Sequence, residues 1–179
     1  GGLSQRSPLS HVAPFIAPHH TASRTSIVGG GNRVITPGAI SLAHHGVLFI
    51  DEAPECAAGT LDSLRQPLES GTITIARSVG SLTFPAQFLL VLAANPCPCG
   101  KFTGKGRACI CSSLAVRRYL GKLSGPLMDR IDMRVQVEPV SRTEMAQTEL
   151  GESSADIRAR VVAARATAEA RFANESWEL

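Results

Sequence analysis

The sequence has no long hydrophobic run. No apolar stretch in its 179 residues approaches the roughly 20 residues that a membrane-spanning helix needs. The opening Gly1-Gly2-Leu3-Ser4 also lacks the pattern of a secretory signal peptide. The formal net charge of +3 is too small to indicate nucleic-acid binding by itself, and it leaves room only for local basic patches. We therefore expect a cytoplasmic protein with no membrane partner.

The sequence also lacks the phosphate-binding loop GxxxxGK[ST]. Its Gly-Lys pairs at 100–101, 104–105 and 121–122 have neither the spacing nor the following Ser or Thr. The glycine-rich stretch 29–32 has no lysine, so the tip of a hairpin is the better interpretation. Without the backbone amides and lysine of that loop, the main groups that bind the phosphates of a nucleoside triphosphate are missing.

Composition otherwise describes a soluble globular protein. Hydrophobic residues make up 44% of the chain and charged residues 18%. The length suits one domain with a real core and part of a second. Five cysteines without a secretory leader favour a reducing compartment, where metal ligation is commoner than disulfide bonding.

An apolar run over residues 46–50 ends abruptly at two adjacent acids, Asp51 and Glu52. Such a run predicts a strand buried on both faces, as in a parallel sheet. Acids at the end of a buried strand cost desolvation unless they hold a cation or a polar reactant. Asp51 is therefore a candidate Mg²⁺ ligand and Glu52 a candidate for polarising the attacking water of a nucleotide hydrolase. The alternative is a strand that ends in an acidic turn.

A second buried-strand pattern over residues 87–94 ends at Asn95, just before Pro96. If the two strands are neighbours, Asn95 emerges beside Glu52, where its amide could orient the same water. An Asn before Pro is also a common start of a turn.

The rest of the chain predicts helices separated by a β-hairpin. Arg77 lies near the hairpin tip and is a candidate ligand contact, although a solvated charge is the commoner explanation. The predicted elements are a helix over 59–69 stopped by Gly71, the hairpin at 72–84, helices at 112–120 and near 126–129, a strand at 133–137, and a helix starting at Ser153 with Asp156 in its capping box.

Four of the cysteines form two CxC pairs, Cys97 with Cys99 and Cys109 with Cys111. Four thiolates suit tetrahedral Zn²⁺, and the basic residues of the intervening loop would lower thiol pKa values. Reduced spectator thiols are the alternative. The fifth, Cys56, stands apart. The histidine pairs 19–20 and 44–45 are poor chelates because adjacent side chains diverge in a strand.

Several long motifs, in one order, resemble the magnesium-chelatase-like AAA+ ATPases, and among them the ComM/YifB subgroup. They are APHHTAS at 17–23, PGAISLAHHGVLFIDE at 37–52, LRQPLE at 64–69, NPCPCG at 95–100 and SGPLMDRID at 124–132. The resemblance implies an α/β fold, namely a partial P-loop NTPase core with a parallel sheet, a β-hairpin insertion and the start of a helical lid. The core would span 1–140 and the lid 141–179.

The resemblance also implies roles for single residues. Asp51 and Glu52 match the Walker B acids and Asn95 matches sensor 1. Arg130 matches the arginine finger that a subunit presents to its neighbour's nucleotide in a hexameric ring. Judged locally, Arg130 would more simply pair with Asp129 or Asp132.

The function that follows from the resemblance is the ATPase core of a ComM-like DNA motor, with ATP and Mg²⁺ as cofactors. Such a motor would drive branch migration in recombination or DNA uptake. The hairpin at 72–84 matches the pre-sensor-1 insertion, which makes Arg77 the best candidate for a DNA phosphate contact. The alternatives are a chelatase motor for Mg²⁺ insertion into a porphyrin and a non-enzymatic zinc-stabilised binding module.

One departure limits what these residues could do alone. In the family, the phosphate-binding loop lies upstream of the segment that corresponds to Gly1. We therefore expect the 179 residues by themselves neither to bind ATP tightly nor to hydrolyse it.

Overall fold

The computed structural model describes residues 12–31, 34–57, 59–78, 80–102, 108–140, 145–146 and 151–173. The chain divides into two compact units, Gly1–Gln136 and Val137–Leu179, and each is described by itself. Among the residues described, no helix is both long and apolar enough to cross a membrane.

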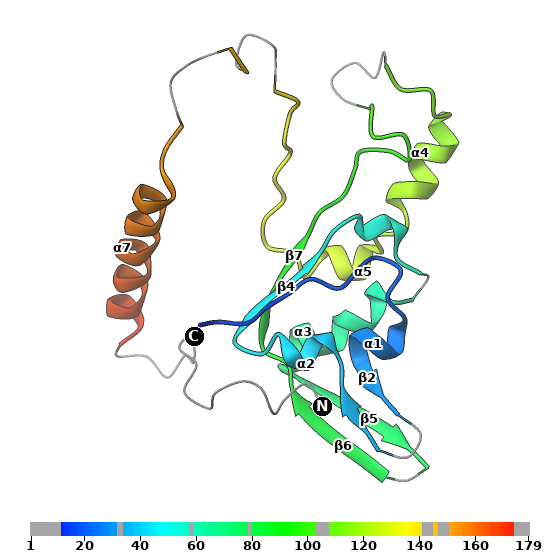
Figure 1. Cartoon of the computed structure of the whole chain (residues 1–179), viewed down its shortest axis with the longest axis vertical. Coiled ribbons are helices and arrows are strands. Elements are labelled where there is room, and N and C mark those ends of the chain that lie inside the picture. The colour runs from blue at the N-terminus through cyan, green and yellow to red at the C-terminus, as the bar shows by residue number, and fades with distance from the viewer. Residues whose placement is uncertain are drawn as a thin grey trace. The chain divides into compact units, whose positions relative to one another are not determined.

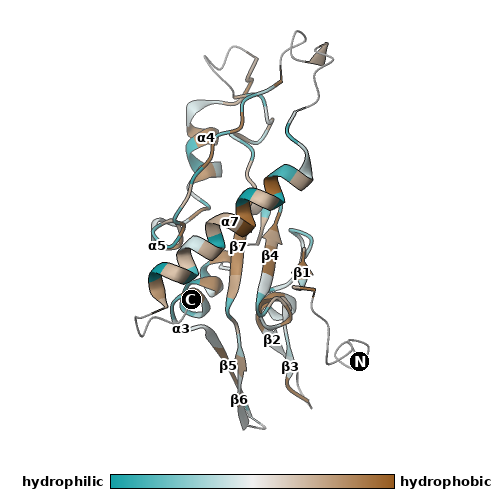
Figure 2. Cartoon of the chain, turned by 90° about the vertical axis from the view of Figure 1, so that its left-hand side faces the viewer, coloured by the Kyte–Doolittle hydropathy of each residue, from teal (hydrophilic) through white to brown (hydrophobic). Residues whose placement is uncertain are grey.

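The centre of the first unit is a parallel sheet of three strands in the order β1-β4-β7 (β4 and β7 are labelled in Figure 1, all three strands in Figure 2). The strands are β1 (Phe15–Ile16), β4 (Gly46–Ile50) and β7 (Phe88–Leu92). The register runs from Gly46 opposite Phe88 to Ile50 opposite Leu92. Both strands predicted from apolar runs are therefore confirmed, and they are direct neighbours.

One face of this sheet carries the core. Leu48 and Ile50 of β4 are 0% and 2% exposed, and they pack with residues from the helices that connect the strands. The expectation that the second strand is buried on both faces is wrong for this chain, because Leu89 and Val91 of β7 are 61% and 38% exposed. They alternate with Phe88, Leu90 and Leu92, which pack against the core, so only one face of β7 is covered. Figure 2 shows that β4 and β7 are both largely apolar (brown).

Short helices cover the buried face and supply the rest of the core. They are α1 (Arg24–Val28), α2 (Ala39–Leu42), the 3-10 helices η1 (Ala53–Glu55) and η2 (Leu61–Leu64), α3 (Arg65–Ser70) and α5 (Gly125–Met128). Ile40, Leu64 and Leu127 are fully buried among them. The predicted helix over 59–69 is a 3-10 turn that continues as α3. It ends at Gly71, whose left-handed φ of 65° suits a glycine.

Two antiparallel hairpins pack against each other. β2 (Gly29–Gly30) pairs with β3 (Thr36–Pro37), and β5 (Thr72–Arg77) pairs with β6 (Gly80–Pro85), which confirms the predicted hairpin. A Cβ on Gly30 would lie 3.0 Å from a terminal nitrogen of Arg77. Glycine therefore allows the two hairpins to approach closely at this point.

The helix predicted over 112–120 is confirmed as α4 (Ser113–Leu120), capped by the Ser112 hydroxyl. The strand predicted at 133–137 is wrong. Residues 131–140 have no regular structure, and Met133, Val135 and Val137 are more than four-fifths exposed. Alternation alone does not make a strand, because the backbone also needs a partner strand, and none of the described strands pairs with this segment.

The second unit contains α7 (Ser154–Phe172). The Ser153 hydroxyl accepts a hydrogen bond from the Asp156 amide at 3.2 Å and donates to the Asp156 carboxylate at 2.6 Å. The predicted Ser153 N-cap is therefore confirmed, although the Asp156 carboxylate bonds the Ser153 hydroxyl and not the backbone amide that a capping box uses. An ion pair of 2.6 Å joins Arg160 to Glu152.

Candidate functional site

The carboxyl ends of β4 and β7 meet at one edge of the sheet. Backbone pairing continues beyond the strands, because the Ala93 amide donates to the Ile50 carbonyl and the Ala53 amide donates to the Ala93 carbonyl, both at 2.9 Å. Asp51 and Glu52 thus leave β4 at the edge where the chain runs on from β7 to Asn95. The structure brings the three predicted site residues to the same edge.

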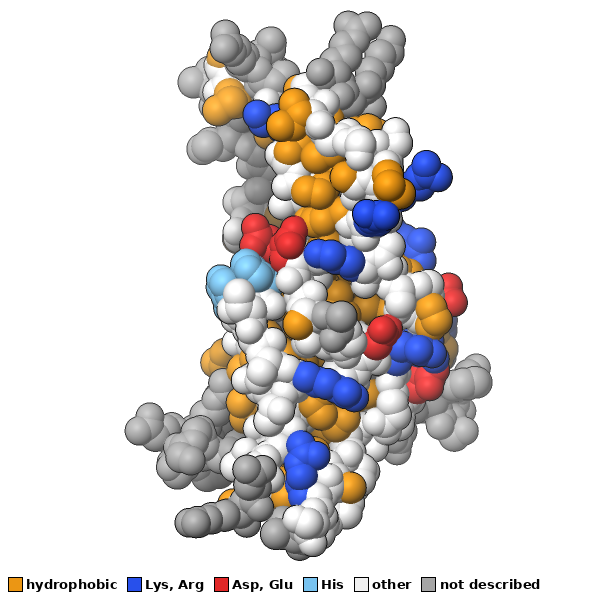
Figure 3. Space-filling model, turned by 90° about the vertical axis from the view of Figure 1, so that its right-hand side faces the viewer, with side chains coloured by type: hydrophobic (Ala, Val, Ile, Leu, Met, Phe, Trp, Pro, Cys, Tyr) orange, Lys and Arg blue, Asp and Glu red, His pale blue; other side chains and the backbone are white. Residues whose placement is uncertain are grey.

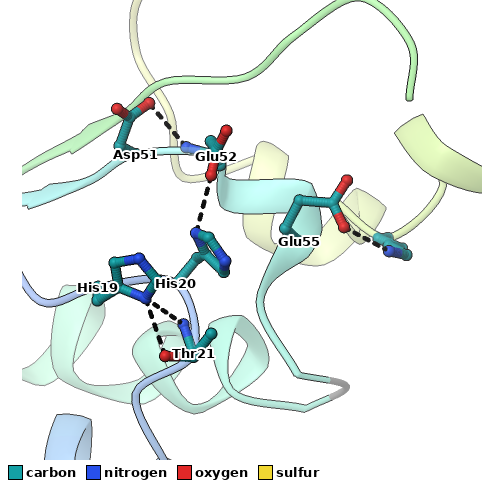
Figure 4. Close-up of polar contacts among 7 residues, drawn as sticks. His19, His20, Thr21, Asp51, Glu52 and Glu55 are labelled. Carbon is teal, nitrogen blue, oxygen red and sulfur yellow. Dashed lines mark hydrogen bonds and ion pairs between the residues drawn. The ribbon is translucent and has the colours of Figure 1, made fainter. Parts of the chain in front are cut away.

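Glu52 has an unusual backbone conformation. Its φ of 49° and ψ of 41° lie in the left-handed region, which costs a non-glycine residue on the order of 1–3 kcal/mol. The Asp51 carboxylate accepts a hydrogen bond of 2.8 Å from the Glu52 amide and so supports this turn (Figure 4). Such strain, held at the end of a buried strand, is typical of functional sites.

His20 makes a direct contact with Glu52. The His20 Nδ1 lies 2.8 Å from a carboxylate oxygen of Glu52, with the two side chains 25% and 45% exposed (Figure 4). The neighbouring His19 ring lies 4.1 Å away, centroid to centroid, and its Nδ1 contacts the Thr21 hydroxyl at 2.8 Å. The histidine pair follows β1, the strand on the other side of β4, so all three strands direct polar residues to this edge.

Tyr119 of α4 lies among the same groups. Its side chain is 4% exposed, and burial raises the pKa of its hydroxyl, as do the charges of Glu55 and Glu52. A hydrogen bond with the side chain of Asn95 acts in the opposite direction and lowers that pKa. Lys122 lies 5.7 Å from the centre of the Tyr119 ring and 3.6 Å from the Glu55 carboxylate. Tyr119 therefore lies close to Glu55 of η1, to Glu52, which follows β4, and to Asn95, which follows β7.

Arg130 follows α5 and lies against α3. Its Nη2 donates to the carboxylate of Glu69, and its Nη1 donates to the carbonyl of Pro126. The ion-pair partner is thus Glu69, not the adjacent Asp129 or Asp132 that local sequence suggested. The side chain of Arg130 is 25% exposed.

The four cysteines of the two CxC pairs form one cluster. All four Sγ atoms lie within 4.8 Å of one another, and the Cys97 side chain is fully buried. Three of the separations are 3.3 Å for Cys97–Cys99, 3.6 Å for Cys97–Cys109 and 3.7 Å for Cys99–Cys109. These separations are far longer than a disulfide bond, which is about 2.05 Å. They are close to the roughly 3.8 Å edge of a tetrahedron with Zn–S bonds of about 2.3 Å.

The pKa shifts within the cluster differ in direction: the pKa of Cys99 is lowered, which favours a metal-binding thiolate, whereas those of Cys109 and Cys111 are raised. A hydrogen bond from the Lys101 backbone, and then one from Ile110, lower the pKa of the Cys99 thiol to about 6, while burial raises the pKa of Cys109 to about 12. The basic residues 105 and 107, expected to assist, lie outside the described residues. Four convergent sulfurs are the donor set of a structural zinc site.

A basic pocket lies between α1 and β5, away from the carboxylate edge. The cavity is about 300 Å³ and is lined by Arg24, Val28 and Gly29 on one side and by Thr74 and Arg77 on the other. Arg77 donates to the Ala76 carbonyl at 3.2 Å, which leaves most of its N–H groups for other partners. Figure 3 shows Lys and Arg side chains spread along one face of the molecule.

Comparison with known proteins agrees with the motifs and with this fold. The sequence model of the family described as magnesium chelatase, subunit ChlI, matches residues 1–145. The chain belongs to this family.

Three relatives show where in the family the chain lies. It is 48% identical over 172 residues to an uncharacterised protein of Mycobacterium tuberculosis (strain ATCC 25618 / H37Rv), covering 96% of this chain and 34% of the relative. It is 47% identical over 153 residues to the uncharacterised protein YifB of Escherichia coli (strain K12) and, equally, to the competence protein ComM of Haemophilus influenzae. Each of these two matches covers 85% of this chain and 30% of the relative. The chain thus spans about a third of the length of these relatives.

The sequence predicts Asp51, Glu52 and Asn95 at the shared edge of β4 and β7. It does not predict that His20 and Tyr119 lie beside them, or that Glu69 pairs with Arg130. In the sequence, His20 is noticeable only as half of an adjacent histidine pair that makes a poor metal chelate. Its position just after a strand of the parallel sheet was the available signal, because strand ends of one sheet share an edge. Tyr119 is the sole tyrosine of the chain, yet nothing in its helix marks it as a neighbour of Asn95.

Proposed function

We propose that this chain is the hydrolytic core of an AAA+ ATPase motor of the ComM type. The observation that carries the proposal is the shared edge of β4 and β7, where Asp51, Glu52 and Asn95 follow two hydrogen-bonded parallel strands. In open α/β sheets, ligands bind beyond the carboxyl ends of the strands. This chain supplies carboxylates and an amide at that position.

Each residue at the edge has a distinct task. Asp51 would hold Mg²⁺, which when bound neutralises phosphate charge. Glu52 accepts a proton from the attacking water, and Asn95 orients that water through its amide. His20 holds one oxygen of the Glu52 carboxylate and leaves the other free for water. Tyr119 lies beside the Asn95 side chain on the α4 side. Water activation therefore uses a carboxylate whose orientation is set before the nucleotide arrives.

The proposal needs more chain than these residues provide. In the proposed motor, residues 1–140 form the core and residues 141–179 begin a lid. The phosphate-binding loop is supplied from elsewhere in a longer cytoplasmic protein, and Arg130 acts on the nucleotide of a neighbouring subunit in a hexameric ring. Hydrolysis should therefore be measured on the full-length protein.

Replacing Glu52 with Gln in the full-length protein tests the hydrolytic role. Removing a general base should lower kcat by about 10²–10⁴-fold, whereas ATP affinity should stay within about threefold. Glu152→Gln, which removes an exposed carboxylate of similar type far along the sequence, is the control and should retain wild-type turnover. Wild-type hydrolysis by the Glu52→Gln protein would rule out the proposed site.

We propose DNA as the substrate that the motor moves, through branch migration during recombination or DNA uptake. Support comes from the basic pocket of Arg24 and Arg77 at the hairpin β5–β6 and from the 47% identity to the competence protein ComM. The logarithm of the DNA-binding constant falls linearly with the logarithm of the salt concentration, and each phosphate contact that is lost should make this slope shallower by about 1.

The DNA test compares Arg77→Ala with Arg158→Ala, which removes an exposed arginine of α7. We expect weaker branched-DNA binding and a shallower salt dependence only for Arg77→Ala. Unchanged DNA binding, together with ATP-driven metal insertion into a porphyrin, would instead favour a chelatase motor, the activity that the family description names.

We propose that the four clustered cysteines hold a structural Zn²⁺. The donor set and the sulfur separations support this assignment. The loop that begins at Cys97 starts two residues after Asn95, so a metal there would also stabilise the position of the sensor amide.

A further inference from the structure

α5 is fixed to the 3-10 turn η2, which leads directly into α3, by packing and by a hydrogen bond. Leu127 is fully buried in the core cluster together with Leu61 and Leu64 of η2. The Ser124 hydroxyl, which caps α5, donates to the Asp62 carboxylate at 2.5 Å. The base of the segment that carries Arg130 therefore has a defined position relative to η2 and α3.

The guanidinium of Arg130 is held at two of its three nitrogen atoms. Nη2 donates to Glu69 of α3 and Nη1 donates to the Pro126 carbonyl, while Nε is buried without a partner in the described part of the chain. Each Nη atom carries a second hydrogen. The planar guanidinium of Arg130 is thus anchored by groups of its own subunit. Its remaining N–H groups are available to other partners, because the side chain is partly exposed.

The ion pair has little value as a stabilising contact. The Glu69 side chain is 59% exposed, and ion pairs that face solvent contribute little to folding free energy. The Nε, which is buried and has no hydrogen-bond partner among the described residues, is a further cost. The arrangement is therefore poorly explained as a device for stability, whereas it does restrict the many rotamers of a long arginine side chain.

We propose that Glu69 is a positioning residue for Arg130. Its carboxylate holds the guanidinium at the subunit edge in the orientation needed to reach the transferring phosphoryl group of a neighbouring subunit. This inference rests on the proposed function of Arg130. It also gives a role to the last residue of the LRQPLE segment, which the hydrolytic site does not use.

Preorganisation predicts a particular kinetic result. Without Glu69, the arginine must be ordered in each turnover, so kcat should fall while substrate binding is unaffected. In the full-length protein we expect Glu69→Ala to lower kcat about tenfold and to leave the KM for ATP within twofold. Glu69→Gln keeps the side-chain volume and one acceptor oxygen, so its loss should be smaller. Both variants should melt within about 2 °C of wild type, because the Glu69 side chain is 59% exposed.

Two further proteins complete the test. Arg130→Lys keeps the charge but removes the planar fork, and in that background Glu69→Ala should cause no further loss of kcat, because there is no fork left to position. Glu152→Gln breaks the exposed ion pair with Arg160 and is the matched control, with kcat unchanged.

The outcomes separate this inference from the proposed function. Three results would each overturn the positioning role. The first is a pair of independent losses in kcat that multiply when Glu69→Ala is combined with Arg130→Lys. The others are an unchanged or raised kcat in Glu69→Ala, and a fall in kcat that tracks a fall in melting temperature. Full activity of Arg130→Ala would instead refute the finger assignment itself. Should Glu69→Ala fail to fold, the kcat of Glu69→Gln, measured alone and in the Arg130→Lys background, decides the question.

Discussion

Replacing Cys99 with Ser should abolish stoichiometric zinc binding. Three of the sulfur separations, 3.3, 3.6 and 3.7 Å, are within about 0.5 Å of a tetrahedral Zn–S₄ edge, and no pair of the four sulfurs is more than 4.8 Å apart, so the sulfurs already lie close to the arrangement that zinc requires. Structural zinc sites contribute about 10–16 kcal/mol of apparent binding free energy in zinc-finger peptides at pH 7. That value is comparable to the net stability of a whole domain, about 5–15 kcal/mol, so the loss of zinc should also lower the melting temperature.

The assay is zinc content per chain of the full-length protein, purified under reducing conditions from zinc-supplemented cells. We expect about one zinc per chain in the wild type and less than about 0.1 in Cys99→Ser, because structural sites use four ligands. Cys56→Ser is the control, since Cys56 lies outside the cluster and should retain the metal. Hydrolysis should fall together with zinc, because the loop begins next to Asn95. Wild-type protein without zinc, or Cys99→Ser with a full equivalent, would refute the reasoning.

Two other predictions concern stability. Leu127→Ala should lower the free energy of unfolding by about 2–5 kcal/mol, since Leu127 is fully buried, and denaturant titration measures the change; a loss below about 1 kcal/mol would contradict the packing described. Burial, and then the neighbouring His45, lower the pKa of His44 from 6.5, so the unfolded chain binds more protons. Stability should therefore fall as the pH drops below 6.5 towards the lowered pKa, and His44→Gln should show a smaller decline in melting temperature over that range. An identical decline in both proteins would exclude His44 as the cause.

Much of the fold could be predicted from the sequence because its signals are local. The apolar run before Asp51, the alternation in β5 and β6, and the serine caps of α4 and α7 each act within a few residues of chain. The sequence predicts Asn95 beside Glu52 only on the condition that the two predicted strands are neighbours. Sequence alone does not show this, because strands that pair in a parallel sheet need not follow one another in the chain. The register of β4 with β7 now provides the missing information.

The errors and omissions arise from contacts between distant segments. Residues 133–137 alternate as a strand does, yet strand formation also needs a pairing edge, which periodicity cannot show. The second strand was expected to be buried on both faces because its residues are uniformly apolar. Glu69 lies 61 residues from its ion-pair partner Arg130, and no pattern within α3 predicts that contact.

The most direct test of the proposed hydrolytic edge is a structure of the full-length protein with Mg²⁺ and a non-hydrolysable ATP analogue. We predict the terminal phosphate beyond the carboxyl ends of β4 and β7, with Asp51 in the metal coordination sphere and a water between Glu52 and the phosphorus. A nucleotide bound elsewhere, with Asp51, Glu52 and Asn95 all outside hydrogen-bonding reach of its phosphates, metal and waters, would contradict the account.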